Sequence, residues 1–137
     1  MRAYLDVRVT LELKALDLAR PRIAKDEVRR MLAGNTPEGG SGAPRLDNQL
    51  HQYFIEKSGN RYLRDFFRQY GGYYTALFDY ATLGAEVVAD MAAQHREILG
   101  HVLAGHWAKA RAELAHHIRA QEPVLRRMRA RLEERDK

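Results

Sequence analysis

The chain has 137 residues, of which 45% are hydrophobic and 30% charged, which is the balance of one globular domain with a single core. It contains no run of roughly 20 apolar residues and no apolar leader after Met1, so we expect a soluble, cytoplasmic protein with no membrane contact. Cysteine is absent, which excludes disulfides and thiolate ligands, and the net charge of +5 is mixed with acidic residues, without any nucleic-acid-binding or phosphate-binding motif.

The first segment, residues 5–19, carries two competing patterns. Apolar and polar residues alternate over 5–13, which is the period of a strand, but Arg8 and Glu12 form an ion pair at helical spacing. The chain offers no second strand with which this segment could pair, and an isolated strand is unstable. We therefore predict a helix over 5–19.

The next two segments are a short helix and a loop. Pro21 ends the first helix, and residues 24–32 have the spacing of a short amphipathic helix. Residues 34–44 contain four glycines and two prolines, which predicts a flexible loop. Because the flanking helices are too short to build separate cores, we place this loop within one domain that spans residues 1–137.

Two further helices follow the loop. We predict the first over 45–57, ended by Gly59 in the left-handed conformation, and we predict Asn60 as the N-cap of the second, over 61–82. The second helix is rich in aromatic residues, and we expect a kink at Gly71-Gly72. An aromatic stripe of this kind more often forms a core or a dimer interface than a ligand site.

Two long helices complete the chain. After Gly84 apolar residues recur at spacings of three and four until Gly105 interrupts the pattern. The last helix begins at Trp107 and runs past Leu125, with a kink expected at Pro123. Six helices without an internal repeat predict an all-α fold, an antiparallel helical bundle.

Four residues with metal-binding side chains lie within the apolar stripes of these helices. Asp47 and His51 are four residues apart, so a helix over 45–57 places both on its apolar face. His95 and His117 lie in the apolar stripes of the last two helices. The other three histidines are on polar faces or at a helix start: His101, His106 and His116.

Such buried polar groups need a partner, because an unpaired charge in the interior is costly. Three imidazoles and one carboxylate are a suitable ligand set for zinc, nickel, manganese or iron(II), and they leave positions open for water or a second ligand. Bundles commonly build metal sites from facing helices. The alternative is a buried hydrogen-bond network without a metal, and spacing alone leaves both open.

Three sequence patterns extend over nearly the whole chain: Arg8-x-x-Leu11-Glu12-x-x-Ala15-x-x-Leu18-Ala19, then Asp47-x-x-Leu50-His51 with Ser58-Gly59-Asn60-x-x-Leu63, and finally Gln94-His95-Arg96-x-Ile98-Leu99 with Ala110 and His117. Together they resemble the FadR C-terminal domain (FCD) family, the effector-binding half of GntR-type bacterial transcription regulators. The chain departs from the family pattern at three positions, where phenylalanine, glutamate and aspartate are usual: Leu50, Gln94 and His106.

The resemblance implies a dimerising helical bundle in which the four selected residues bind a divalent metal. It also implies a small organic acid as effector, bound near the metal with the help of Arg8, and we add Asn60 as a second effector contact. Members that lack the metal ligands bind fatty acyl-CoA, so the presence of all four argues against that branch. Contact with DNA requires a winged helix-turn-helix module, which we do not find in residues 1–137.

We therefore predict a sensor domain and not an enzyme. The main alternative is a metal-dependent enzyme, since a His3Asp site with an open position can activate water, and Glu12 or a tyrosine would then serve as the base. A third interpretation is a purely structural dimerisation module, in which the metal only joins three helices.

Overall fold

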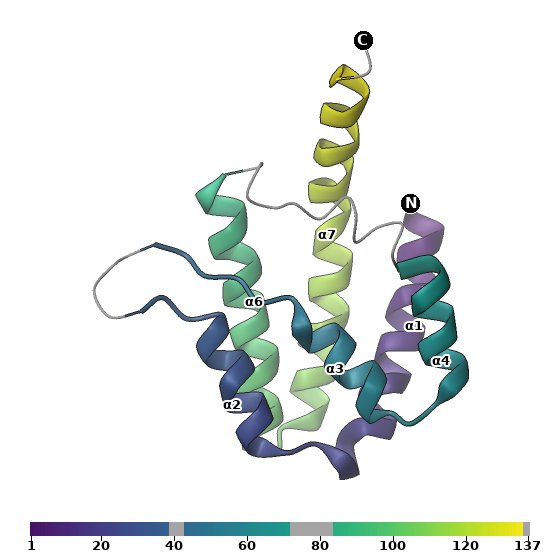
Figure 1. Cartoon of the computed structure of the whole chain (residues 1–137), viewed down its shortest axis with the longest axis vertical. Coiled ribbons are helices and arrows are strands. Elements are labelled where there is room, and N and C mark those ends of the chain that lie inside the picture. The colour runs from purple at the N-terminus through teal and green to yellow at the C-terminus, as the bar shows by residue number, and fades with distance from the viewer. Residues whose placement is uncertain (39–42, 72–83, 136–137) are drawn as a thin grey trace.

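The computed structural model describes residues 1–38, 43–71 and 84–135. Six α-helices and no strand occur in these ranges, as predicted for an all-α fold (Figure 1). The helices are α1 (Arg2–Ala19), α2 (Lys25–Gly34), α3 (Gln49–Lys57), α4 (Arg61–Phe66), α6 (Ala85–Ala104) and α7 (Trp107–Arg135). A 3-10 turn, η1 (Arg20–Arg22), follows α1, and a π-helical turn, η2 (Phe67–Gly71), follows α4.

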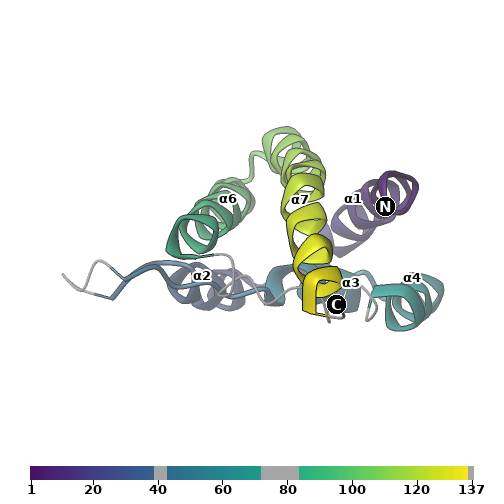
Figure 2. The same cartoon turned by 90° about the horizontal axis from the view of Figure 1, so that it is seen from above.

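The helices form two layers. Seen from above, α6, α7 and α1 lie in one layer and α2, α3 and α4 in the other (Figure 2). The long helix α7 packs against both α6 and α1 and runs antiparallel to them, while α2 packs on α6 and α3 packs on α1. The largest fully buried apolar side chains come from both layers: Leu5, Leu16, Leu50, Phe54, Ile98, Leu99, Leu114, Ile118 and Leu125.

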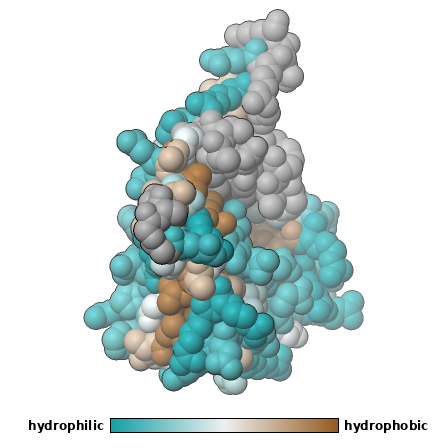
Figure 3. Space-filling view, turned by 60° about the vertical axis from the view of Figure 1, so that its left-hand side comes forward, coloured by the Kyte–Doolittle hydropathy of each residue, from teal (hydrophilic) through white to brown (hydrophobic). Residues whose placement is uncertain are grey.

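The face of the molecule seen in Figure 3 is mostly hydrophilic. The side that carries α2 and α6 shows one narrow hydrophobic strip between hydrophilic flanks (Figure 3). None of the helices in the described part of the chain is long and apolar enough to cross a membrane. The apolar stripes read from the sequence therefore point inward, where the two layers meet.

The predicted start of the third helix is wrong. We expected this helix over 45–57, but α3 begins only at Gln49. Two local hydrogen bonds explain the difference: Oδ1 of Asp47 accepts from the backbone N–H of Gln49 at 2.8 Å, and the backbone N–H of Asp47 donates to Asn35 at 3.0 Å. Aspartate bonding of this kind competes with helical hydrogen bonding, so Asp47 lies in an extended segment before α3.

Two other boundaries differ slightly, because α1 begins at Arg2 and α2 extends to Gly34, while the predicted cap residues are confirmed. Gly59 takes the left-handed conformation with φ of +66°, and Asn60 caps α4 by accepting from the backbone N–H groups of Tyr62 and Leu63. The helix expected over 61–82 is described only as α4 and η2. The proposed kink residue Gly72 and part of the aromatic stripe lie outside the described residues: Tyr73, Tyr74, Phe78 and Tyr80.

Helix α7 continues through Pro123, and its kink there stays a prediction.

Candidate metal centre

Three histidines from three helices converge in the space between the two layers. His51 projects from α3, His95 from α6 and His117 from α7. The Nε2 atom of His117 lies 3.2 Å from Nε2 of His51 and 3.1 Å from Nε2 of His95. His95 and His117 are each 1% exposed, whereas His51 is half-buried. The structure thus brings together the three histidines that the sequence selected.

The opposite ring nitrogen of each histidine meets an oxygen atom. Nδ1 of His51 lies 2.5 Å from Glu12 Oε1, and Nδ1 of His117 lies 2.6 Å from Gln94 Oε1. Nδ1 of His95 lies 3.0 Å from both Asn35 Oδ1 and the carbonyl oxygen of Asp47. Carboxylate and carbonyl oxygens only accept hydrogen bonds, so each ring carries its proton on Nδ1. The Nε2 atoms of the neutral rings then present lone pairs.

Two of the rings stay neutral at ordinary pH. Burial, followed by the charge of His51, lowers the pKa of His95 to about 3. The same two causes, in the same order, hold the pKa of His117 well below its usual value. With both protons on Nδ1, the Nε2 atoms of His95 and His117 lie 3.1 Å apart and do not hydrogen-bond to each other. A cation could bind both of these Nε2 atoms.

Two of the three nitrogen–nitrogen separations fit a divalent metal ion. Two nitrogens that each lie about 2.1 Å from one ion are about 3.4 Å apart in a tetrahedron and about 3.0 Å apart in an octahedron. The separations of 3.1 and 3.2 Å in the cluster fall between these values. Histidines that bind metals commonly donate their other N–H to an oxygen, which fixes the ring. All three rings meet that condition, so the cluster is compatible with a metal site.

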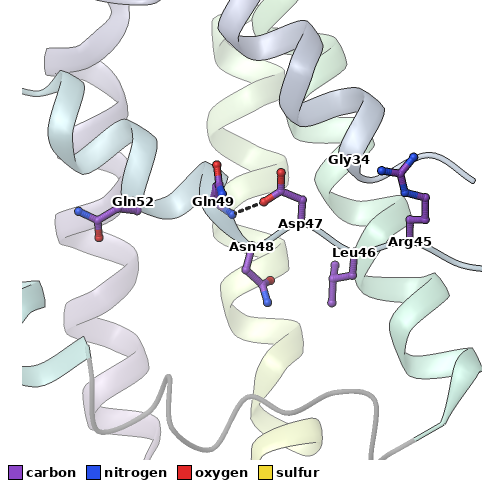
Figure 4. A pocket seen from close by; sticks show the side chains of 7 residues that line it. All are labelled: Gly34, Arg45, Leu46, Asp47, Asn48, Gln49 and Gln52. Atoms are coloured by element: carbon purple, nitrogen blue, oxygen red, sulfur yellow. Dashed lines mark hydrogen bonds between the residues drawn. The ribbon is translucent and has the colours of Figure 1, made fainter.

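Asp47 is not part of this cluster. Its side chain is turned toward Gln49, at the wall of an open pocket of about 680 Å³ (Figure 4). Only its main chain reaches the site, through the carbonyl that meets His95. The carboxylate also lies under the end of α2, where a Cβ built on Gly34 would be 2.8 Å from Asp47 Oδ2.

Arg8, which we predicted as an effector contact on the first helix, lies beside the cluster. It is 6% exposed, forms an ion pair with Glu12, and donates to Oε1 of Gln121 at 2.5 Å. Burial alone would raise the pKa of Glu12, but the charges of Arg8 and His51 outweigh it and lower that pKa to about 2. The carboxylate of Glu12 is thus ionised between two groups that donate to it.

Comparison with models of protein families assigns the chain to a family. The sequence model of the FCD domain matches residues 3–120. The chain belongs to the FCD domain family. FCD domains are the effector-binding domains of GntR-type regulators, a regulatory and not a catalytic role. Comparison with curated proteins and with solved structures gave no match.

Two residues of this FCD domain belong to the site although the sequence analysis missed them. Asn35, which we assigned to a flexible loop, is fully buried and ties Asp47 to His95. Gln121 is 1% exposed and places its Nε2 atom 3.0 Å from Nε2 of His117. Gln121 follows His117 by one helical turn on α7, and that spacing was a usable signal.

The described contacts of Asn60 are those of a helix cap, in which its side-chain oxygen accepts from two backbone N–H groups. Among the other histidines, His106 and His116 are exposed and His101 is half-buried, which agrees with their assignment to the outside.

Proposed function

We propose that this FCD domain binds a divalent metal ion through His51, His95 and His117, and senses a small organic acid at that ion. The observation that carries the proposal is the convergence of three Nε2 atoms whose rings are fixed from behind by oxygen acceptors. Zinc, nickel, manganese and iron(II) all accept such nitrogen ligands. The alternative is a buried hydrogen-bond network, in which Gln121 donates to His117 while His95 and His117 make no hydrogen bond to each other.

Asp47 is our proposed fourth ligand. Two hydrogen bonds hold its main chain next to His95: the N–H of Asp47 donates to Asn35 Oδ1, and the carbonyl of Asp47 accepts from the ring of His95. Ligation requires that its carboxylate leave the N–H of Gln49 and turn toward the three rings. Water can then satisfy that N–H, because Gln49 is exposed. The carboxylate would balance part of the ion's charge.

The effector we propose is a small carboxylate. Arg8 is a buried guanidinium beside the cluster, and a metal ion would add two further positive charges there. Glu12 supplies one negative charge close by, so the site as a whole favours an anion. Asn60 remains a proposed second contact. In an intact regulator, we propose, the domain forms a homodimer and effector binding shifts the arrangement of DNA-binding modules.

Elemental analysis after gentle purification tests the metal. We expect about one equivalent in the wild-type protein and a large loss in His117→Ala. His116→Ala is a matched control, because His116 is the exposed neighbour of His117 on the same helix and should keep the metal. Absence of metal from the wild-type protein, also after incubation with zinc or nickel salts, contradicts the proposal.

A panel of small organic acids tests the sensor. A bound effector raises the melting temperature by mass action, by an amount that grows with its concentration. We expect such a shift in the metal-loaded protein and none in His117→Ala. Metal binding without a shift for any acid would favour the structural dimerisation module. Size-exclusion chromatography with light scattering checks the dimer.

A further inference from the structure

Gln121 joins Arg8 to the histidine cluster through one buried amide. Its Oε1 accepts from Arg8 at 2.5 Å, and its Nε2 lies 3.0 Å from Nε2 of His117. Arg8 has only donors, so the amide oxygen has to face Arg8 and the amide nitrogen has to face His117. An N–H of Gln121 therefore donates to the lone pair of His117.

That lone pair is also the one that His117 offers to a metal ion. A ring nitrogen has a single lone pair, which bonds either an N–H or a cation. The side-chain amide of Gln121 cannot avoid this competition by exchanging the places of its oxygen and nitrogen, because its N–H groups would then point at the N–H donors of Arg8. Once His117 binds a metal, an N–H of Gln121 is left in a buried place without its acceptor, and such a group costs free energy.

We propose that Gln121 couples metal binding to effector binding, by giving up His117 to the metal and donating the released N–H to the effector's carboxylate. This inference rests on the proposed function. A carboxylate oxygen on the metal is the acceptor that Gln121 then lacks, and the neighbouring Arg8 holds the amide in the required orientation. Metal and carboxylate binding should strengthen each other, and the coupling is reciprocal.

Two substitutions at Gln121 separate its two roles, with Co²⁺ as the metal and acetate as the carboxylate probe. Gln121→Met removes the competing N–H, so we expect Co²⁺, titrated against a chelator, to bind about fivefold more tightly. The same variant lacks the donor to the carboxylate. We expect acetate to bind the Co²⁺-loaded variant about tenfold more weakly, read from the cobalt absorption bands.

Gln121→Glu provides a second variant that keeps an acceptor for Arg8. We expect it to bind Co²⁺ at least as tightly as the methionine variant and to lose acetate binding through charge repulsion. Imidazole, a neutral metal ligand, serves as the control probe and should bind wild-type and methionine proteins within about twofold. Gln69→Met, at an exposed position in η2, should change none of these values. Circular dichroism and melting temperature establish that each variant is folded.

Each outcome decides a separate statement. Unchanged acetate binding in Gln121→Met overturns the coupling. Weaker Co²⁺ binding in the same variant overturns the competition for His117, because it shows that Gln121 supports the metal. In either case the metal site itself stands. If the wild-type protein binds no Co²⁺, the proposed function fails and this inference fails with it.

Discussion

Glu12→Gln is the substitution whose effect on stability follows most directly from the structure. Glu12 is 2% exposed and lies between the guanidinium of Arg8 and the ring of His51. Glutamine keeps the shape and an acceptor oxygen, but it removes the negative charge. The buried cation of Arg8 then loses its counter-charge.

The size of the effect can be worked from the pKa of Glu12. Its displacement from 4.5 to about 2 means that the folded protein favours the ionised over the neutral carboxyl by about 3 kcal/mol. Breaking a buried ion pair costs about 3–5 kcal/mol, which is the same range. We therefore expect the free energy of unfolding at pH 7 to fall by about 3 kcal/mol, which lowers the melting temperature of a domain of this size by about 10 °C.

Urea unfolding in the presence of EDTA measures this loss without a contribution from metal. The pH dependence has a defined sign: the folded pKa of Glu12 is lowered, so its stabilisation is present above pH 4.5 and is lost as the pH falls toward 2. The difference between wild type and variant should narrow over that window. Glu97→Gln, at an exposed position, should change stability by no more than about 0.5 kcal/mol. A loss below about 1 kcal/mol for Glu12→Gln, or a difference independent of pH, would refute the reasoning.

Three further outcomes are expected. Asn35→Ala should lower the free energy of unfolding by about 2–3 kcal/mol in urea titrations, because it removes the acceptor of the N–H groups of Asp47 and His95. It should also weaken metal binding about 10- to 100-fold. A variant with wild-type stability and wild-type metal affinity would contradict both expectations. Gly34→Ala should cost about 1–3 kcal/mol in the same assay, because the new Cβ meets Asp47 Oδ2 at 2.8 Å. With free metal at 100 times its Kd, removing the metal with EDTA should lower the free energy of unfolding by about 3 kcal/mol. The stability of His95→Ala should not respond to EDTA.

The fold and the three histidines could be predicted because both follow from apolar periodicity. His95 and His117 occupy positions within apolar stripes, and a stripe of a single-domain bundle faces the core. Helix ends marked by glycine, such as Gly59, were equally predictable. Each of these inferences uses neighbours within one or two helical turns, so the sequence contains all that they need.

The partners of the histidines could not be predicted in the same way. Asn35 meets His95 across 60 positions of the chain, and Gln121 meets Arg8 across 113. A buried amide is stable only when distant groups complete its hydrogen bonds, and no local pattern records where those groups lie. Asn35 also follows a glycine at a helix end, which locally favours a loop assignment.

Asp47 was selected from its local spacing, but contacts with distant residues decide its position. Its substitution by asparagine is the sharpest test of the proposed ligand set. In the structure Asp47 accepts from the N–H of Gln49, and a cation at the centre of the cluster would offer its carboxylate a charged partner instead. Asparagine keeps an oxygen for Gln49 but lacks the charge. Asp47→Asn should therefore change the free energy of unfolding in EDTA by less than about 1 kcal/mol, and weaken zinc binding about 10- to 100-fold. Wild-type zinc affinity in this variant would leave the histidines as the whole protein contribution to the site.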